Sequence, residues 1–205
     1  MVLVPDCSQI TINCGTGHAG GAKWKGREMS ETIRILHREH RNLARILDVL
    51  EAQLDIYRQG GVPDFDLIGD IVHYTLSFPE RHHHPKEDLI FERIEAKGAQ
   101  GRDLAAELLE EHKMGEGLTR RLAEVLGNIA QDAEVPRDSF EDLARRFLDF
   151  NRRHMTKEED HFFPLAEKLL SAADWSAIDA RVSGGDDPLF GKDIDQRYQA
   201  LRDIL

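Results

Sequence analysis

A histidine interrupts the apolar stripe of each of four long helical segments, and this pattern constrains the fold more than any other feature of the chain. Within each segment the apolar residues recur every three to four positions, as in helices that bury one face. Glycine and proline breakers separate the segments, and no alternating pattern typical of strands competes. The segments run over about 31–58, 64–97, 102–131 and 136–170. The pattern predicts an all-α fold, an antiparallel up-down four-helix bundle with a short C-terminal helical extension.

The predicted bundle occupies the middle of a chain of 205 residues. Residues 1–28 show neither helical nor alternating spacing, so we expect a flexible extension there. Met29 precedes Ser30, a suitable N-cap for the first helix, and we hypothesise that Met29 is the natural start and the extension is not native. We assign residues 29–170 to the bundle and residues 171–205 to a short helix and a tail that pack on it.

Composition and charge exclude several classes of function. The net charge of −11 argues against binding to nucleic acid or to an anionic membrane surface. No apolar run approaches the roughly 18 residues of a transmembrane helix, and no signal-peptide pattern is present, so we expect a cytoplasmic protein. Cys7, Cys14 and His18 lack the paired spacing of a zinc site, and we expect no role for them.

Six polar residues on the four stripes converge on one layer of the predicted bundle. Two stripes carry a glutamate four residues after the histidine, and residues at this spacing lie on one face of a helix. Antiparallel neighbours come level when they lie equally far from their shared turn, and the six positions meet this condition. The converging residues are His40, His83, Glu87, His112, His154 and Glu158.

Four imidazoles and two carboxylates in one buried layer require a partner, because isolated charges are costly to bury. A bound cation, or a pair of cations, meets that requirement. Imidazole and carboxylate ligands without thiolate suit iron, manganese or zinc. Two carboxylates in the core of a bundle favour a bridged centre with two metal ions.

Four short motifs carry a resemblance to a known family. They are LHREH at 36–40, HHPKED at 83–88, EH at 111–112 and HMTKEE at 154–159. Together they resemble the hemerythrin-like HHE cation-binding domains, over a region from about Ser30 to the end of the chain. The resemblance implies a four-helix bundle around two iron ions, bridged by carboxylates and by an oxo or hydroxo group. Manganese or zinc are the alternative metals.

The resemblance also implies that the six converging residues are the metal ligands, as in the branch with four histidines and two glutamates that is similar to iron–sulfur repair proteins. Oxygen-carrying members have a second histidine four positions along the third helix, where this chain has Glu116. Glu116 and His161 are candidates for additional ligands, and His37 is the rival of His40. We expect His82 and His84 to lie on the surface.

Five further positions carry structural expectations. Pro85 and Pro164 each remove a backbone donor inside a predicted helix, which predicts a local bend beside the ligands. Gly115 and Gly117 leave room beside the centre for a small ligand. Ser171 is a suitable N-cap for the short helix that follows the bundle.

The predicted function is that of a di-iron protein that binds or reacts with O2, NO or peroxide, in sensing, stress response or iron–sulfur repair. We expect a small diatomic ligand or peroxide as partner, an unidentified electron donor, a monomer or homodimer, and no dedicated catalysis. The alternative is storage, donation or sensing of iron. An oxidase of the ferritin kind is less favoured, because its helices carry Glu-x-x-His pairs and this chain carries His-x-x-x-Glu.

Overall fold

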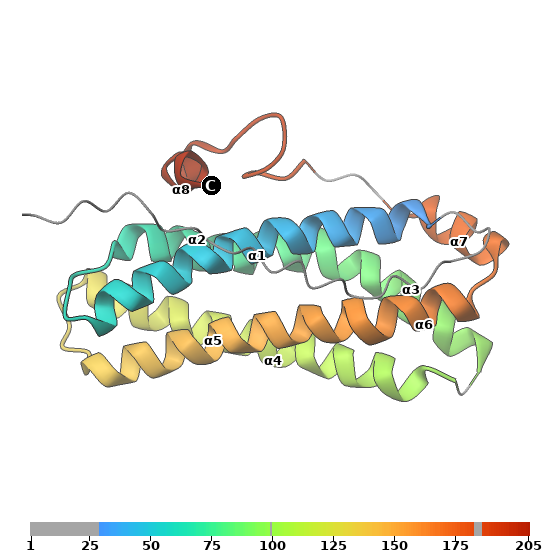
Figure 1. The fold of residues 1–205 in the computed structure, drawn as a ribbon, viewed down its shortest axis with the longest axis horizontal. Coiled ribbons are helices and arrows are strands. Elements are labelled where there is room, and N and C mark those ends of the chain that lie inside the picture. Colours follow the sequence, from blue (N-terminus) through green and yellow to red (C-terminus); the bar gives the residue numbers. More distant parts are fainter. Residues whose placement is uncertain (1–28, 99, 183–185) are drawn as a thin grey trace, which may run out of the picture.

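The computed structural model describes residues 29–98, 100–182 and 186–205, and within these ranges every regular element is a helix (Figure 1). The expectation of an all-α protein is therefore confirmed. The expectations about residues 1–28, including those for Cys7, Cys14 and His18, lie outside the described residues. None of the helices in the described part is both long enough and apolar enough to cross a membrane.

Four long helical rods make up most of the described chain. The first is α1 (Glu31–Arg58), and the third is α4 (Arg102–Ala130). The second and fourth each contain a π-helical turn between two α-helices. The second consists of α2 (Phe65–Phe78), η1 (Pro79–His83) and α3 (His84–Lys97), and the fourth of α5 (Arg137–Lys157), η2 (Glu158–Phe162) and α6 (Phe163–Leu169).

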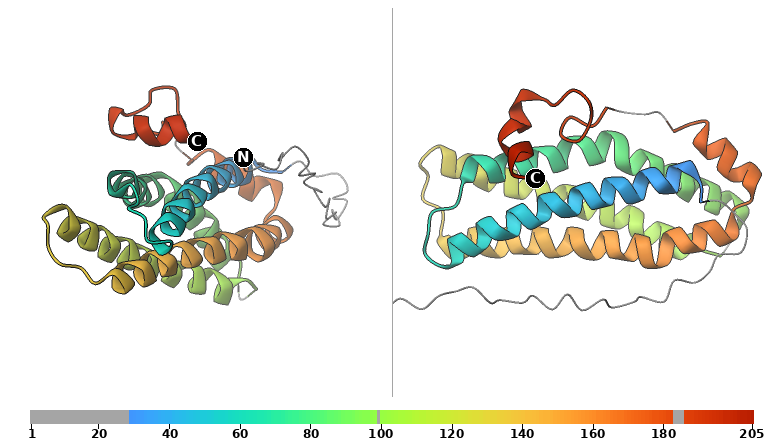
Figure 2. Two further views of the ribbon diagram at one scale, coloured as in Figure 1. Left: turned by 60° about the vertical axis from the view of Figure 1, so that its left-hand side comes forward. Right: turned by 45° about the horizontal axis from the view of Figure 1, so that its top comes forward.

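The four rods lie side by side along the long axis of the molecule (Figures 1 and 2). Helix α1 packs against α2 and α5, and α4 packs against α2, α3 and α5. Ser30 caps α1 by accepting a hydrogen bond from the amide of Ile33 at 3.1 Å. After the last turn of α1, Gly60 adopts a φ of 90°, which ends the helix at a conformation that side chains rarely adopt. The first rod therefore begins and ends where the sequence places its cap and its breaker.

The two π-helical turns have a common cause in proline. Each turn ends two residues before a proline, Pro85 in one rod and Pro164 in the other. Proline lacks the N–H that would bond to the carbonyl four residues earlier, so the helix is locally rearranged. In both turns the next amide bonds instead to the carbonyl five residues back. The expected bends are π-helical turns, and His83 and Glu158 lie inside them.

The apolar core forms two separate clusters, and the polar residues stand between them. On α1, Leu36 belongs to one cluster and Leu43 to the other, with His40 between the two. On the second rod, Phe78 and Ile90 belong to different clusters and lie on either side of the predicted ligands. The polar layer therefore interrupts an otherwise continuous core.

The C-terminal part contains α7 (Ala172–Asp179), η3 (Gln196–Tyr198) and α8 (Gln199–Ile204). Helix α7 contacts α1 and α3, and α8 contacts α2. Tyr198 and Leu201 contribute to the larger apolar cluster, so this segment shares the core of the rods.

The expectation that Ser171 caps a short helix is confirmed. Its hydroxyl accepts a hydrogen bond from the amide of Asp174, and the carboxylate of Asp174 accepts one from the amide of Ser171, which together form a capping box. Asp174 also forms ion pairs with Lys97 and Arg93 of α3. The hydrogen bonds from Lys97, Ser171 and Arg93 hold the pKa of Asp174 below its usual value.

Candidate metal centre

The structure brings all six converging residues together in the polar layer. Helix α1 contributes one of them, α4 another, the second rod a histidine and a glutamate, and the fourth rod a histidine and a glutamate. The two glutamates are fully buried, and the histidine side chains are at most 9% exposed. The set is His40, His83, Glu87, His112, His154 and Glu158.

Glu87 lies between histidines of three different rods. Its Oε1 is 3.3 Å from Nε2 of His83 and 3.8 Å from Nε2 of His40. Its Oε2 is 3.3 Å from Nε2 of His112. The two oxygens of one carboxylate therefore face different histidines, which is the arrangement required of a bridging ligand.

Glu158 spans the layer in the same manner. Its Oε2 is 3.3 Å from Nε2 of His40, and its Oε1 is 3.2 Å from Nε2 of His154 and 3.5 Å from Nε2 of His112. On the first side, Nε2 of His40 and Nε2 of His83 are 3.0 Å apart. The donors thus form one side around His40 and His83 and a second side around His112 and His154, joined by both carboxylates.

The donor atoms fit a metal centre by distance and by lack of other partners. Two ligand atoms at about 2.1 Å from one ion and at right angles to each other are about 3.0 Å apart, close to the separations seen here. Among the described residues, no hydrogen-bond partner is found for either carboxylate oxygen of Glu87 or Glu158, or for Nε2 of His112 or His154. Buried polar atoms in native proteins are rarely left in that state. Cations held by these atoms would account for it.

Contacts between the histidines and the glutamates of this layer shift the pKa values of both. Burial lowers the pKa of His40, but contacts with Glu158 and Glu159 outweigh it and raise the pKa to about 10. Burial likewise opposes the charge on His112, whose contacts with Glu158 and Glu87 raise its pKa to about 10. Burial disfavours the charged form of Glu158, and the neighbouring imidazoles hold its pKa well below the usual value. The two carboxylates therefore favour positive charge on the neighbouring imidazoles, and a metal ion would supply that charge in place of protons.

Three further carboxylates contact the outer nitrogens of the histidines, and sequence reasoning missed all of them. Glu39 lies 2.9 Å from Nδ1 of His83, and Glu111 lies 2.9 Å from Nδ1 of His154. Glu159 lies 3.1 Å from Nδ1 of His40. A signal was present, because each of the three is the immediate sequence neighbour of a predicted ligand.

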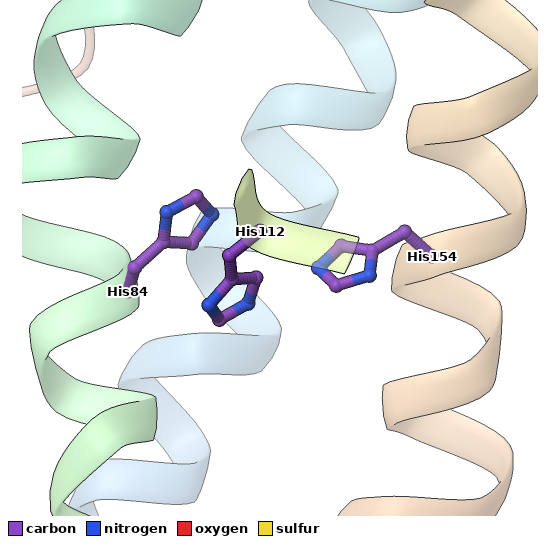
Figure 3. A group of neighbouring side chains, drawn as sticks. All are labelled: His84, His112 and His154. Carbon is purple, nitrogen blue, oxygen red and sulfur yellow. The ribbon is translucent and has the colours of Figure 1, made fainter. Parts of the chain in front are cut away.

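The expectation that His84 lies on the surface is wrong. Its ring stacks on that of His112, with ring centroids 3.9 Å apart and an angle of 13° between the planes (Figure 3). Nitrogen atoms of His84, His112 and His154 lie within 4.8 Å of one another. The reason is that the second rod packs against both α1 and α4, so its buried arc is wider than a single stripe and includes the residue after His83. His82 is half-buried against the ring of Phe78.

The three candidates for additional ligands lie outside the converging set. His37 is partly exposed, and its Nδ1 is 3.2 Å from Glu159. Glu116 accepts a hydrogen bond from Nε of Arg120 at 3.0 Å, at the partly exposed end of the layer. His161 is exposed.

A small cavity of about 30 Å³ adjoins the centre, and histidines of both sides line it, namely His40, His83, His112 and His154. This volume holds a ligand the size of water. His84, Gly115 and Phe150 contribute to its wall. Gly115 provides space for Phe150, because a Cβ at this position would lie 2.8 Å from Cε1 of that ring.

Gly117 has a different environment. A Cβ at Gly117 would meet nothing within 4 Å, and Gly117 lines a groove that also contains Arg121 and Arg153 and not the small cavity. Of the two glycines expected beside the centre, only Gly115 lies in the wall of this cavity.

Comparison with known protein families gives one informative result. The model of the hemerythrin HHE cation-binding domain matches residues 31–166, which include all four rods except the last three residues of α6. No curated protein matches the chain. All six converging residues lie within the matched region.

Proposed function

Because the chain belongs to the hemerythrin HHE cation-binding family, we propose that its buried layer of histidines and glutamates holds two iron ions and binds or reacts with O2, NO or peroxide. The roles considered are sensing, stress response and iron–sulfur repair. The observation that carries the proposal is the pair of carboxylates whose four oxygens have no hydrogen-bond partner among the described residues and face histidines on both sides.

The ligand assignment follows the two sides of the layer. His40 and His83 would hold one ion, and His112 and His154 the other. Glu87 and Glu158 would bridge them. Two bridging carboxylates between two pairs of imidazoles favour a dinuclear centre over a single ion. Such iron ions would supply electrons and an open coordination position for a diatomic ligand.

The packing of the rods supports the four-helix bundle that the family implies. Each rod follows the previous one through a short connection, and neighbouring rods lie side by side (Figure 1). We propose the antiparallel up-down order, in which each ligand histidine is level with those of the neighbouring rods.

The small cavity lined by histidines of both sides supports access of a small ligand to the centre. His84, Gly115 and Phe150 limit the space there to about the size of a water molecule or a diatomic. Burial of the glutamates excludes bulk water from the layer, which strengthens the electrostatic interactions within it. The cavity would therefore suit small ligands such as O2, NO or peroxide.

A second candidate function is sensing or handling of iron through the stability of the fold. The observation that favours it is the division of the apolar core into two clusters by the polar layer. Metal ions bound in this polar layer would hold the four rods together between the two clusters, so metal binding would be coupled directly to folding. The expected signature is a large loss of helicity or of melting temperature when iron is removed.

The test is metal analysis of chain reconstituted anaerobically with Fe²⁺, followed by rapid-mixing absorption measurements with O2 and with NO. Two irons per chain and a spectral change on mixing are expected. One ion or none per chain would contradict the dinuclear centre. A fully loaded protein whose spectrum is unchanged by either gas would contradict the reactivity and favour the iron-handling function.

A further inference from the structure

The centre is assembled from two helical hairpins that repeat the same pattern of residues. The first hairpin is α1 with the second rod, and the second hairpin is α4 with the fourth rod. The sequence Glu-His occurs on α1 at 39–40 and on α4 at 111–112. The sequence His-x-x-Lys-Glu occurs on the partner rods, at 83–87 and at 154–158. The glutamate of the first motif and the histidine of the second are 44 residues apart in one hairpin and 43 in the other. The repeat includes one glutamate and one lysine in each hairpin that belong to neither donor set.

In the first hairpin these two residues form a chain of contacts that ends at a predicted ligand. Oε2 of Glu39 is 2.9 Å from Nδ1 of His83. Oε1 of Glu39 accepts a hydrogen bond from Nζ of Lys86 at 2.8 Å. The side chains of Glu39 and Lys86 are 10% and 5% exposed. This is a buried pair and not a surface ion pair, and loss of one partner would leave a buried charge.

The second hairpin repeats these contacts. Oε2 of Glu111 is 2.9 Å from Nδ1 of His154, and Oε1 of Glu111 pairs with Nζ of Lys157. Lys157 also donates to Glu107 at 2.7 Å. Glu107 therefore shares the lysine of Glu111 but forms no contact with the histidine in the structure.

We propose that Glu39 with Lys86, and Glu111 with Lys157, are positioning pairs that orient His83 and His154 for metal binding. An ionised carboxylate can only accept a hydrogen bond, so Nδ1 of each histidine must carry the hydrogen. The lone pair is then on Nε2, the atom that faces the bridging glutamates at 3.2–3.3 Å. The lysine holds the carboxylate in this position and compensates its charge.

The inference rests on the proposed metal centre and adds four residues to it. Carboxylates that hold the outer nitrogen of a ligand histidine fix the tautomer and the ring orientation, and their removal lowers metal affinity by about 10- to 100-fold. The second hairpin offers the cleaner test, because Glu107→Ala removes a carboxylate bonded to the same lysine without disturbing His154.

The experiment measures binding of Co²⁺ to the full chain by competition with a chelator, together with the visible spectrum of the bound Co²⁺. Glu111→Ala should weaken binding by about 10- to 100-fold and alter the spectrum, whereas Glu107→Ala should stay within about twofold of wild type. Glu111→Gln keeps an oxygen that can accept from Nδ1 and should recover part of the affinity. The melting temperatures of the metal-free variants report on folding.

The outcomes separate the two proposals. Wild-type affinity and spectrum in Glu111→Ala would overturn the positioning role, and so would equal losses in Glu111→Ala and Glu107→Ala. If Glu111→Ala fails to fold, the comparison of Glu111→Gln with Glu107→Ala decides in the same way. A wild-type chain that binds no Co²⁺ and no Fe²⁺ would overturn the metal centre itself, whatever the variants do.

Discussion

Replacing Glu158 by glutamine should remove most of the metal-dependent stability, because this carboxylate contacts both sides of the layer. Its Oε2 is 3.3 Å from His40 and its Oε1 is 3.2 Å from His154. Glutamine preserves the volume and one carbonyl oxygen, so the substitution opens no cavity. It removes the negative charge and one of the two acceptor oxygens, and it would therefore disturb both ions of the proposed centre at once.

The magnitude follows from the linkage between binding and folding. At a free metal concentration of 100 times Kd, each bound ion adds about 2.7 kcal/mol to the free energy of unfolding, so two ions add about 5.4 kcal/mol. In a domain of this size about 1 kcal/mol changes the melting temperature by about 2–4 °C. Chelation should therefore lower the melting temperature of the wild type by about 10–20 °C. The corresponding change in Glu158→Gln should be below about 5 °C.

The assay is scanning calorimetry with and without a chelator, with metal content measured on the same samples. Asp160→Asn is the matched control, since it makes the same chemical change two residues away at an exposed position. That variant should retain the wild-type response to chelation. A metal-dependent change in Glu158→Gln as large as that of the wild type would refute the bridging assignment.

Three further predictions follow from particular contacts. Gly117→Ala should stabilise its helix by up to about 1 kcal/mol, since a Cβ at this position meets nothing. Gly115→Ala should have a free energy of unfolding about 1–3 kcal/mol below that of Gly117→Ala, because the new Cβ presses on Phe150. Urea unfolding measures both variants, and equal effects would contradict the packing described. Asp174→Asn should lower the free energy of unfolding by about 1 kcal/mol at pH 7. Because folding lowers the pKa of this carboxyl, its stabilisation of the fold is present above the unfolded pKa of about 3.9 and is lost as the pH falls through the lower folded value. Unfolding measured against pH tests this, and an effect of the substitution that stays the same in acid would contradict the ion-pair origin. His161→Ala should leave the metal content unchanged, since that side chain is exposed, and a loss of one ion would place it among the ligands.

Periodicity and local chemistry determined much of the fold from the sequence. The first helix was predicted over about 31–58 and is observed at Glu31–Arg58, because Ser30 and Gly60 mark its two ends. Proline chemistry indicated where the two bent rods depart from regular helix, although not that the departures would be π-helical turns. These features depend on residues within a few positions of one another, so the linear pattern is sufficient to predict them.

The six converging residues were also predictable from the sequence, because a polar side chain in an apolar stripe identifies both its face and its depth. The residues that surround these six could not be predicted in the same way. His84 was placed on the surface because single-helix periodicity describes only one buried stripe, while packing against two neighbours buries a wider arc. The carboxylates of Glu39 and Glu111 were overlooked because their contacts join residues more than 40 positions apart.

The sequence by itself therefore determined which residues form helices and which polar side chains enter the core. Only the tertiary structure decided how those side chains face one another. Which oxygen of Glu87 faces which histidine, and which nitrogen of His83 faces Glu39, depend on the axial register and rotation of neighbouring rods. Those quantities are set by the packing of whole helices, to which every apolar contact in the two clusters contributes, and no local pattern encodes them.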